Sequence, residues 1–226
     1  MRYRAKASKQ IMKPVLVYFY ENTHITRADM KKIIILLAIT VFMVTGCASQ
    51  SSEENSNEKV ENTAFETSQG TVEIENRSIL SDEIEIMLPM EFGEMSEEAA
   101  KEKYPAEERP TLIFTNDDGS VNVAFSYTAN ACKEEDIPQY FNVLKENMQK
   151  TITVKEWYSD SVENQNGIKI AKLEFLTPAV DTDIYNLMYL VSLDDRLLIC
   201  SFNSTKELMD EWKPIGEAIM GSIKKK

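Results

Sequence analysis

The sequence predicts a domain of the α/β (α+β) class, built on a largely antiparallel sheet of six or seven strands with helices on both faces. Three observations lead to this expectation. Apolar side chains alternate with small or polar ones from Val121 to Tyr127, which is the period of a strand with one apolar face. Residues 136–150 place their apolar side chains on one helical stripe. Turn sequences rich in Asn, Asp and Gly separate neighbouring strand segments, as in hairpins.

The first half of the domain is expected to contain four strands and one short helix. Ser96 has the side chain of a helix N-cap, and Pro105 ends the helix that would follow it. The turn Asn116-Asp117-Asp118-Gly119 joins the last two strands of this half. The expected strands are 72–75, 83–88, 111–115 and 120–127.

The second half is expected to contain two helices and two hairpins. The hairpins pair 154–163 with 168–176 and 182–193 with 197–203, and the helices cover 136–150 and a final segment after Ser204 or Thr205. Both faces of 182–193 are apolar, which is typical of a central strand covered on both sides. In the final helix, Trp212 is expected to anchor the core, Pro214 to kink the axis, and Lys224–Lys226 to interact with the helix dipole.

A secretory signal precedes the domain. Met30 is followed by Lys31 and Lys32 and then by the apolar run 33–44, which is shorter than the roughly 20 residues of a membrane-spanning helix. The tetrapeptide Val44-Thr45-Gly46-Cys47 resembles the lipobox of bacterial lipoproteins, although that motif prefers Leu where this chain has Val44. The resemblance implies that Cys47 carries a lipid such as palmitate and becomes the new N-terminus. The alternative is a buried cysteine at the end of an ordinary hydrophobic helix.

These features divide the chain into four parts. Residues 1–29 precede a complete signal. We expect them to be an upstream segment that appears because the start codon is misassigned, with Met30 the real first residue, or else a long leader that is cleaved off. Residues 30–46 form the lipoprotein signal peptide. Residues 47–70 carry the lipidated cysteine and a disordered tether, which would hold the domain about 25 to 30 Å from the lipid. Residues 71–226 form a single globular domain.

Charge and histidine content exclude several classes of protein. From Cys47 onward the chain has 17 Lys and Arg against 35 Asp and Glu, a net charge near −18, so it lacks the basic surface that binds nucleic acid. The only histidine, His24, precedes the expected cleavage site. The mature domain would therefore have no histidine for a catalytic triad, a zinc site or proton transfer near neutral pH. No cofactor, no metal and no catalytic residue are expected.

The order of elements resembles the PsbP-like fold, an α/β/α sandwich shared by a photosystem extrinsic subunit, a Ran-binding transport factor and many small bacterial lipoproteins. The resemblance is carried by Ile84–Pro89, Arg109–Thr111, Asn166–Gly167, Asp183–Asn186 and Trp212–Ile223. None of these segments is a catalytic motif. The resemblance implies a non-enzymatic partner-binding or assembly module, and it transfers no partner and no site residue.

Two sets of polar residues have competing interpretations. Export would permit a disulfide between Cys132 and Cys200. Their Cα distance decides whether it can form, since Cα atoms more than about 7 Å apart cannot be joined.

Carboxylate oxygens are also ligands for calcium or magnesium, but turn chemistry explains the acidic pairs without a metal. These pairs are Asp117-Asp118, Asp181/Asp183 and Asp194-Asp195.

Trp157 and Tyr158 are the candidate ligand-binding residues. Most aromatic side chains of the domain are expected to lie in the core or in cross-strand pairs. Trp157 and Tyr158 are adjacent in an expected strand, so their side chains point to opposite faces and one of them would be exposed.

The hypothesis from the sequence is a non-enzymatic binding or assembly module of the cell envelope. Lipid on Cys47 would hold it on the extracytoplasmic face of the cell membrane, and its partner would be an unknown envelope protein or ligand, not nucleic acid. The alternative is a carboxylate-dependent hydrolase of wall or glycan material, which would show an enclosed cleft with two carboxyl groups of raised pKa. A transporter's solute receptor is a third hypothesis, although such receptors usually have two lobes and a longer chain.

Overall fold

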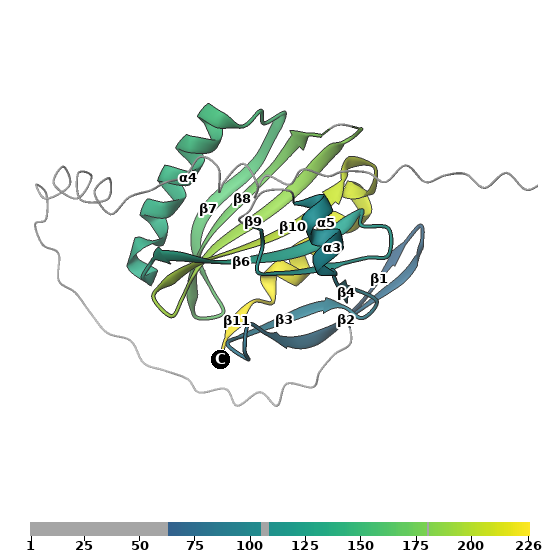
Figure 1. The fold of residues 1–226 in the computed structure, drawn as a ribbon, viewed down its shortest axis with the longest axis horizontal. Coiled ribbons are helices and arrows are strands. Elements are labelled where there is room, and N and C mark those ends of the chain that lie inside the picture. Colours follow the sequence, from purple (N-terminus) through teal and green to yellow (C-terminus); the bar gives the residue numbers. More distant parts are fainter. Residues whose placement is uncertain (1–62, 105–108, 180) are drawn as a thin grey trace, which may run out of the picture. The chain divides into compact units, whose positions relative to one another are not determined.

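A seven-stranded antiparallel sheet forms the centre of the computed structural model, which describes residues 63–104, 109–179 and 181–226 (Figure 1). The strands lie in the order β4-β5-β6-β10-β9-β8-β7. Their bounds are Gly93–Glu94 (β4), Leu112–Thr115 (β5), Val121–Ala131 (β6), Arg196–Thr205 (β10), Asp183–Leu193 (β9), Ile168–Pro178 (β8) and Glu156–Gln165 (β7). The structure thus confirms the predicted fold class and the antiparallel sheet.

The hairpins of this sheet turn where the sequence predicts. Asn166 and Gly167 between β7 and β8 have φ values of 50° and 78°, and Asp194 and Asp195 between β9 and β10 have 49° and 55°. Positive φ at both central residues is the geometry of a type I′ turn, whose twist matches that of the strands it joins. Turn geometry therefore accounts for the acidic pair Asp194-Asp195.

Four further strands form a separate antiparallel sheet in the order β1-β2-β3-β11. They are Thr63–Thr67 (β1), Gly70–Ile79 (β2), Ile84–Pro89 (β3) and Lys224–Lys225 (β11). The sequence predicts β2 and β3 but not their assignment to a second sheet. The role predicted for Lys224 and Lys225 at the helix end is wrong, because they pair with Glu85 and Ile84 of β3.

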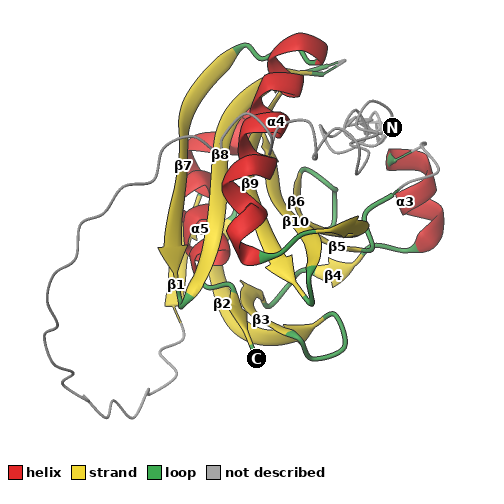
Figure 2. Cartoon of the chain, turned by 90° about the vertical axis from the view of Figure 1, so that its left-hand side faces the viewer, coloured by secondary structure: helices red, strands yellow, loops and turns green. Residues whose placement is uncertain are grey.

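Helices cover both faces of the large sheet, as predicted. α4 (Ile137–Thr151) packs on β7, β8 and β9, and α5 (Met209–Gly221) packs on β9 and β10 from the opposite side (Figure 2). The short α3 (Glu97–Lys103) begins after Ser96, whose Oγ accepts a hydrogen bond of 3.2 Å from the amide of Ala99. The 3-10 turns η1 (Glu134–Asp136) and η2 (Lys206–Leu208) precede α4 and α5. No helix among the described residues is long and apolar enough to span a membrane.

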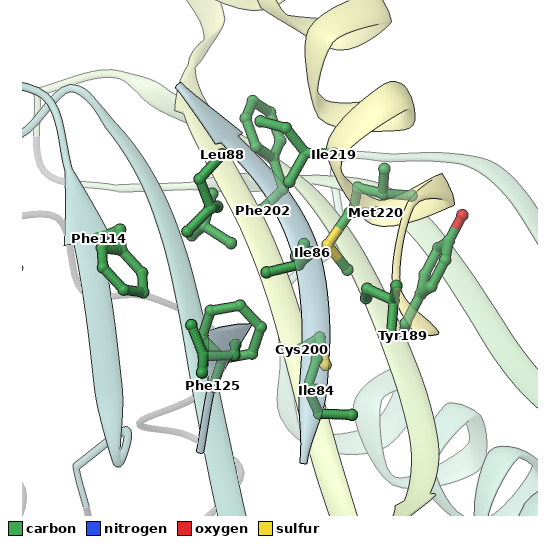
Figure 3. Close-up of a cluster of buried hydrophobic side chains, with 14 of the residues drawn as sticks. Ile84, Ile86, Leu88, Phe114, Phe125, Tyr189, Cys200, Phe202, Ile219 and Met220 are labelled. Atoms are coloured by element: carbon green, nitrogen blue, oxygen red, sulfur yellow. The ribbon is translucent and has the colours of Figure 1, made fainter. Parts of the chain in front are cut away.

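The main hydrophobic core lies where the large sheet, α5 and the small sheet meet (Figure 3). It joins Ile84, Ile86 and Leu88 of β3 to Phe125 of β6, Cys200 and Phe202 of β10, and Ile219 and Met220 of α5. Trp212 of α5 is 2% exposed and stacks on Phe92 with 5.6 Å between ring centroids, in agreement with its predicted anchoring role. Full burial of large apolar side chains contributes about 1.5 to 3 kcal/mol each, so this core fixes α5 on the sheet.

The predicted boundary between tether and domain at residue 70 is wrong. β1 begins at Thr63 and pairs antiparallel with β2, with Thr63 opposite Ile74 and Thr67 opposite Gly70. Phe65 is partly buried and packs against the main core. The composition of this segment is polar, but backbone hydrogen bonds to β2 and one aromatic side chain are sufficient to order it.

Several predictions concern residues outside the described ranges. They are the upstream segment 1–29, the signal peptide 30–46, lipidation of Cys47 and the tether up to residue 62. These stay predictions from the sequence.

We expect Gly216→Ala to destabilise the domain by about 1 to 3 kcal/mol, as is typical of overpacking. A Cβ at Gly216 would lie 2.6 Å from the ring of Phe202, so α5 or the ring would have to move. Gly221→Ala at the end of the same helix is the control, because nothing lies within 4 Å of a Cβ there. Urea unfolding of both variants measures the difference, and equal midpoints would contradict this account of the close packing.

Candidate functional site

Two adjoining hollows lie at the turn between β5 and β6. The larger has a volume of about 420 Å³ and is bordered by β4, α3 and the turn, and the smaller, of about 250 Å³, is bordered by the β1–β2 hairpin and the same turn. Both are lined by Glu91, Asn116, Asp117 and Asp118. The turn therefore forms a common wall, and the sequence signal for it is the Asn-Asp-Asp-Gly segment.

Hydrogen bonds fix the conformation of this turn. The side chain of Asn116 accepts a hydrogen bond from the amide of Val121 at 3.0 Å and donates one to Ser120 Oγ at 2.9 Å. The amide of Ser120 donates to Asp118 Oδ1 at 2.9 Å. Gly119 has a φ of 75°, a conformation that glycine adopts without steric cost. The carbonyl of Gly119 is thereby held in place beside the end of α3.

Lys103, the last residue of α3, reaches into this region. Its Nζ donates to the carbonyl of Gly119 at 2.7 Å and to Asn122 Oδ1 at 2.9 Å, and its side chain lines the larger hollow. Asn122 is fully buried, and its Nδ2 donates to the same carbonyl at 3.2 Å, so its Oδ1 is the atom that faces the amine. Burial lowers the pKa of Lys103 to about 8, although the charge of Asp118 acts in the opposite direction.

Acidic side chains surround the larger hollow. They are Glu91, Glu94, Glu102, Asp117 and Asp118. Burial opposes the ionisation of Asp118, but hydrogen bonds from Ser120 and Asn116 and the charge of Lys103 together lower its pKa. Within the described ranges, no group of three or more Asp, Glu, Cys or His residues has an arrangement that could hold a metal ion. The lining of the hollow thus combines one partly buried amine with several carboxylates.

A second polar cluster joins α5 to the opposite end of the large sheet. Glu174 of β8 is 3% exposed, and its carboxylate accepts hydrogen bonds from Ser159 Oγ at 2.7 Å and from the hydroxyl of Tyr185 at 3.0 Å. Lys213 of α5 forms an ion pair with the same carboxylate. Burial disfavours the charged form of Glu174, but these partners hold the pKa below its ordinary value. Both oxygens of this carboxylate have partners from β7, β9 and α5, so the cluster links α5 to the sheet.

Tyr158 belongs to this cluster. Its ring lies 6.1 Å from that of Tyr185, and the ammonium group of Lys213 lies 5.2 Å from its centroid. Its hydroxyl donates to Glu156 Oε2 at 3.1 Å. Packing against α5 is therefore the observed environment of this candidate ligand-binding residue.

Trp157 lies on the opposite face of the sheet, under α4. Its ring stacks on Phe175 with 5.5 Å between centroids, and its Nε1 donates to Asp160 Oδ2 at 2.7 Å. Lys145 of α4 forms an ion pair with the same Asp160 oxygen at 2.7 Å. Trp157 and Tyr158 thus point apart as expected, both are partly buried, and neither lines the two hollows.

Cys132 and Cys200 are both buried and both free in the structure. Cys200 lies in the main core, and burial raises the pKa of its thiol beyond the ordinary range. Burial and the charge of Asp136 raise the pKa of Cys132 to about 12. The disulfide that the sequence left open is absent from the structure.

Comparisons with known proteins yield structural likeness only. No family model matches the chain, and a search of curated proteins found no match. Among solved structures, it is similar to cyanobacterial PsbP (CyanoP) from Synechocystis, with a TM-score of 0.47 and 11% identity over 71% of this chain and 96% of that one. A protein from Bacteroides thetaiotaomicron gives a TM-score of 0.44 and 17% identity. The match covers 67% of this chain and 48% of that protein.

LpqN from Mycobacterium tuberculosis, described as involved in cell envelope biogenesis, gives a TM-score of 0.36 and 10% identity, covering 62% of this chain and 81% of LpqN. At such identities the likeness concerns the path of the backbone, and no function is transferred from it.

We expect Glu174→Gln to lower the free energy of unfolding by about 2 to 3 kcal/mol at pH 7, because it leaves the ammonium group of Lys213 partly buried without its partner. The pKa of Glu174 is lowered in the folded state, so the pair's contribution is present above the ordinary carboxyl pKa of about 4.3 and is lost as the pH falls below it. The deficit of the variant should therefore shrink at pH 3. Urea unfolding at both pH values measures it.

The control for this measurement is Glu163→Gln on β7, where the side chain is exposed and a change within about 0.5 kcal/mol is expected. A deficit of Glu174→Gln that is equal at pH 7 and pH 3 would show that lost packing, not lost charge, causes it.

Proposed function

We propose that this protein is a lipid-anchored, non-enzymatic binding module on the extracytoplasmic face of a bacterial cell membrane. The observation that carries the proposal is the order Lys31-Lys32, apolar run 33–44 and Cys47, which has the charge, length and terminal cysteine of a lipoprotein signal. The first described strand begins at Thr63, so residues 48–62 would connect the lipid to the domain. Lipoproteins carry two or three acyl chains, and more than one is needed for stable anchoring.

The pKa shifts of the described carboxyl groups bear on the hydrolase alternative. A glycoside hydrolase needs a general acid whose pKa is raised, so that it is protonated near neutral pH. In the described residues, every carboxyl group whose pKa departs clearly from its ordinary value has a lowered pKa. These groups are Asp82, Glu97, Asp118, Glu146, Asp160, Glu174 and Glu207. The hydrolase alternative therefore draws no support from these groups.

The larger hollow supports a binding role for this end of the domain. Its volume of about 420 Å³ lies within the usual range of ligand sites, about 300 to 1,000 Å³. Apolar atoms of Met95 and Ala99 lie beside the amine of Lys103 and the carboxylates of the turn. This mixture of apolar wall and few fixed polar groups is typical of sites for small molecules or for a protruding partner side chain.

We expect Cys47→Ser to abolish incorporation of an alkyne-tagged palmitate analogue in the native host and to release the protein from the membrane fraction or leave it unprocessed. The thiol is the atom that would carry the lipid, and serine lacks it. Val44→Leu is the matched control, since it restores the residue that the lipobox prefers and should keep or increase labelling. Unchanged labelling of Cys47→Ser would overturn the proposed anchor.

We expect a photo-crosslinking amino acid at position 117 to capture an envelope partner on intact cells, whereas one at position 162 should not. Asp117 is exposed on the wall shared by both hollows, and Val162 is 37% exposed on the edge strand β7. Crosslinked products are identified by mass spectrometry after purification. Capture that is equal at both positions, or found only at 162, would contradict a binding site at the hollows.

A further inference from the structure

Among the described residues, the amine of Lys103 has two neutral hydrogen-bond acceptors and forms no ion pair. Its contacts among the described residues are the carbonyl of Gly119 and Oδ1 of Asn122, and no described carboxylate forms an ion pair with it. An ammonium group has three N–H donors, whereas a neutral amine has two donors and one lone pair. The two acceptors at 2.7 and 2.9 Å use both N–H groups of the neutral amine, so its lone pair is not used by either hydrogen bond.

Lys103 is also one of the residues that line the larger hollow. We propose that this hollow is a covalent capture site for small carbonyl compounds, in which the amine of Lys103 forms an imine with an aldehyde or ketone. The site does not depend on the lipid anchor, and it lies in the same hollow that supports the binding role proposed above. It adds a chemical activity that the sequence motifs do not indicate.

The reaction needs only the carbonyl compound as co-reactant. The nitrogen lone pair forms a bond to the carbonyl carbon, the C=O π electrons move to oxygen, and a proton passes from nitrogen to oxygen to give a carbinolamine. Loss of water then gives the imine. A lysine whose pKa is lowered by burial is suited to this step, because only the unprotonated amine is a nucleophile and a larger fraction of it is unprotonated near neutral pH.

The charges that face Lys103 define the class of ligand. The carboxylates come from the segment before β4, from β4, from α3 and from the turn; they are Glu91, Glu94, Glu102, Asp117 and Asp118. Of these, Asp118 is the one whose charge acts on the pKa of Lys103, and burial outweighs it. A carboxylate or phosphate on the ligand would be repelled by this set. The site therefore takes uncharged or cationic carbonyl compounds of a size that fits about 420 Å³.

Reductive trapping tests the proposal on the purified full chain. The protein is treated with propionaldehyde and sodium cyanoborohydride between pH 7 and pH 10.5, and propylation of each lysine is measured by peptide mass spectrometry. Lys101 is the internal control, since it lies on the same helix, is exposed and pairs with Glu97. The ratio of Lys103 to Lys101 labelling cancels the pH dependence of the reagents.

We expect a ratio of about ten or more at pH 7.5, because an amine with a pKa near 8 has roughly a hundredfold larger neutral fraction there than an ordinary lysine with a pKa near 10.4. The ratio should fall steeply towards pH 10.5. Met95→Trp, which places a larger side chain on the wall of the hollow, should reduce labelling of Lys103 and leave Lys101 unchanged.

Lys103→Arg should remove the adduct from this peptide and leave the Lys101 signal unchanged, which assigns the site. A ratio at or below one at pH 7.5, or a ratio that does not change with pH, would overturn the proposal. Replacing propionaldehyde by glyoxylate should lower the ratio through repulsion by the carboxylates, and a higher ratio with glyoxylate would contradict the proposed ligand class.

Discussion

The two central strands of the large sheet must be covered on both faces, and the rest of the fold depends on this constraint. Every side chain of β9 from Ile184 to Leu193 is buried, and β10 is buried from Leu197 to Thr205. The hydrophobic effect therefore requires a layer on each side. α4 supplies one layer, and α5 with the small sheet supplies the other. The contact of Gly216 with Phe202 sets how closely α5 approaches, and hence where the small sheet packs.

Most helices and long strands could be predicted because each has a local signal. Alternation marks β6, a capping serine marks α3, and an Asn-Gly pair marks the turn from β7 to β8. The division into two sheets could not be predicted, because β2 and β3 show the same alternation whichever sheet they join, and their place follows from long-range packing on α5. β4 and β11 have two residues each, which is too short for any period.

The residues of the candidate site were predicted less well, for a related reason. The turn Asn116–Gly119 has a sequence signal, but Lys103 is one charged residue near the end of a predicted helix, and its link to Asn122 arises only when α3 folds over β6. Glu174 has a sequence signal of its own, a charge within a strand of apolar neighbours. The sequence predicts Trp157 and Tyr158 as ligand-binding residues from their aromatic chemistry, and in the structure they contact α4 and α5.

Two buried charged groups on this domain obey the same physics with opposite results. Burial disfavours the charge of Glu174, but Lys213 and two hydroxyl donors compensate for the lost hydration, so its pKa falls and the carboxylate is fully occupied. Burial also disfavours the charge of Lys103, and the two hydrogen-bond acceptors of its amine are neutral. The pKa of Lys103 is therefore lowered, which favours the neutral amine. The ion pair of Glu174 and Lys213 holds α5 to the sheet, whereas the amine of Lys103 has a larger unprotonated fraction near neutral pH than an ordinary lysine. The reactive group of this domain is therefore expected where a buried charge has no oppositely charged partner among the described residues. That place is the hollow beside α3, and not the cluster around Glu174.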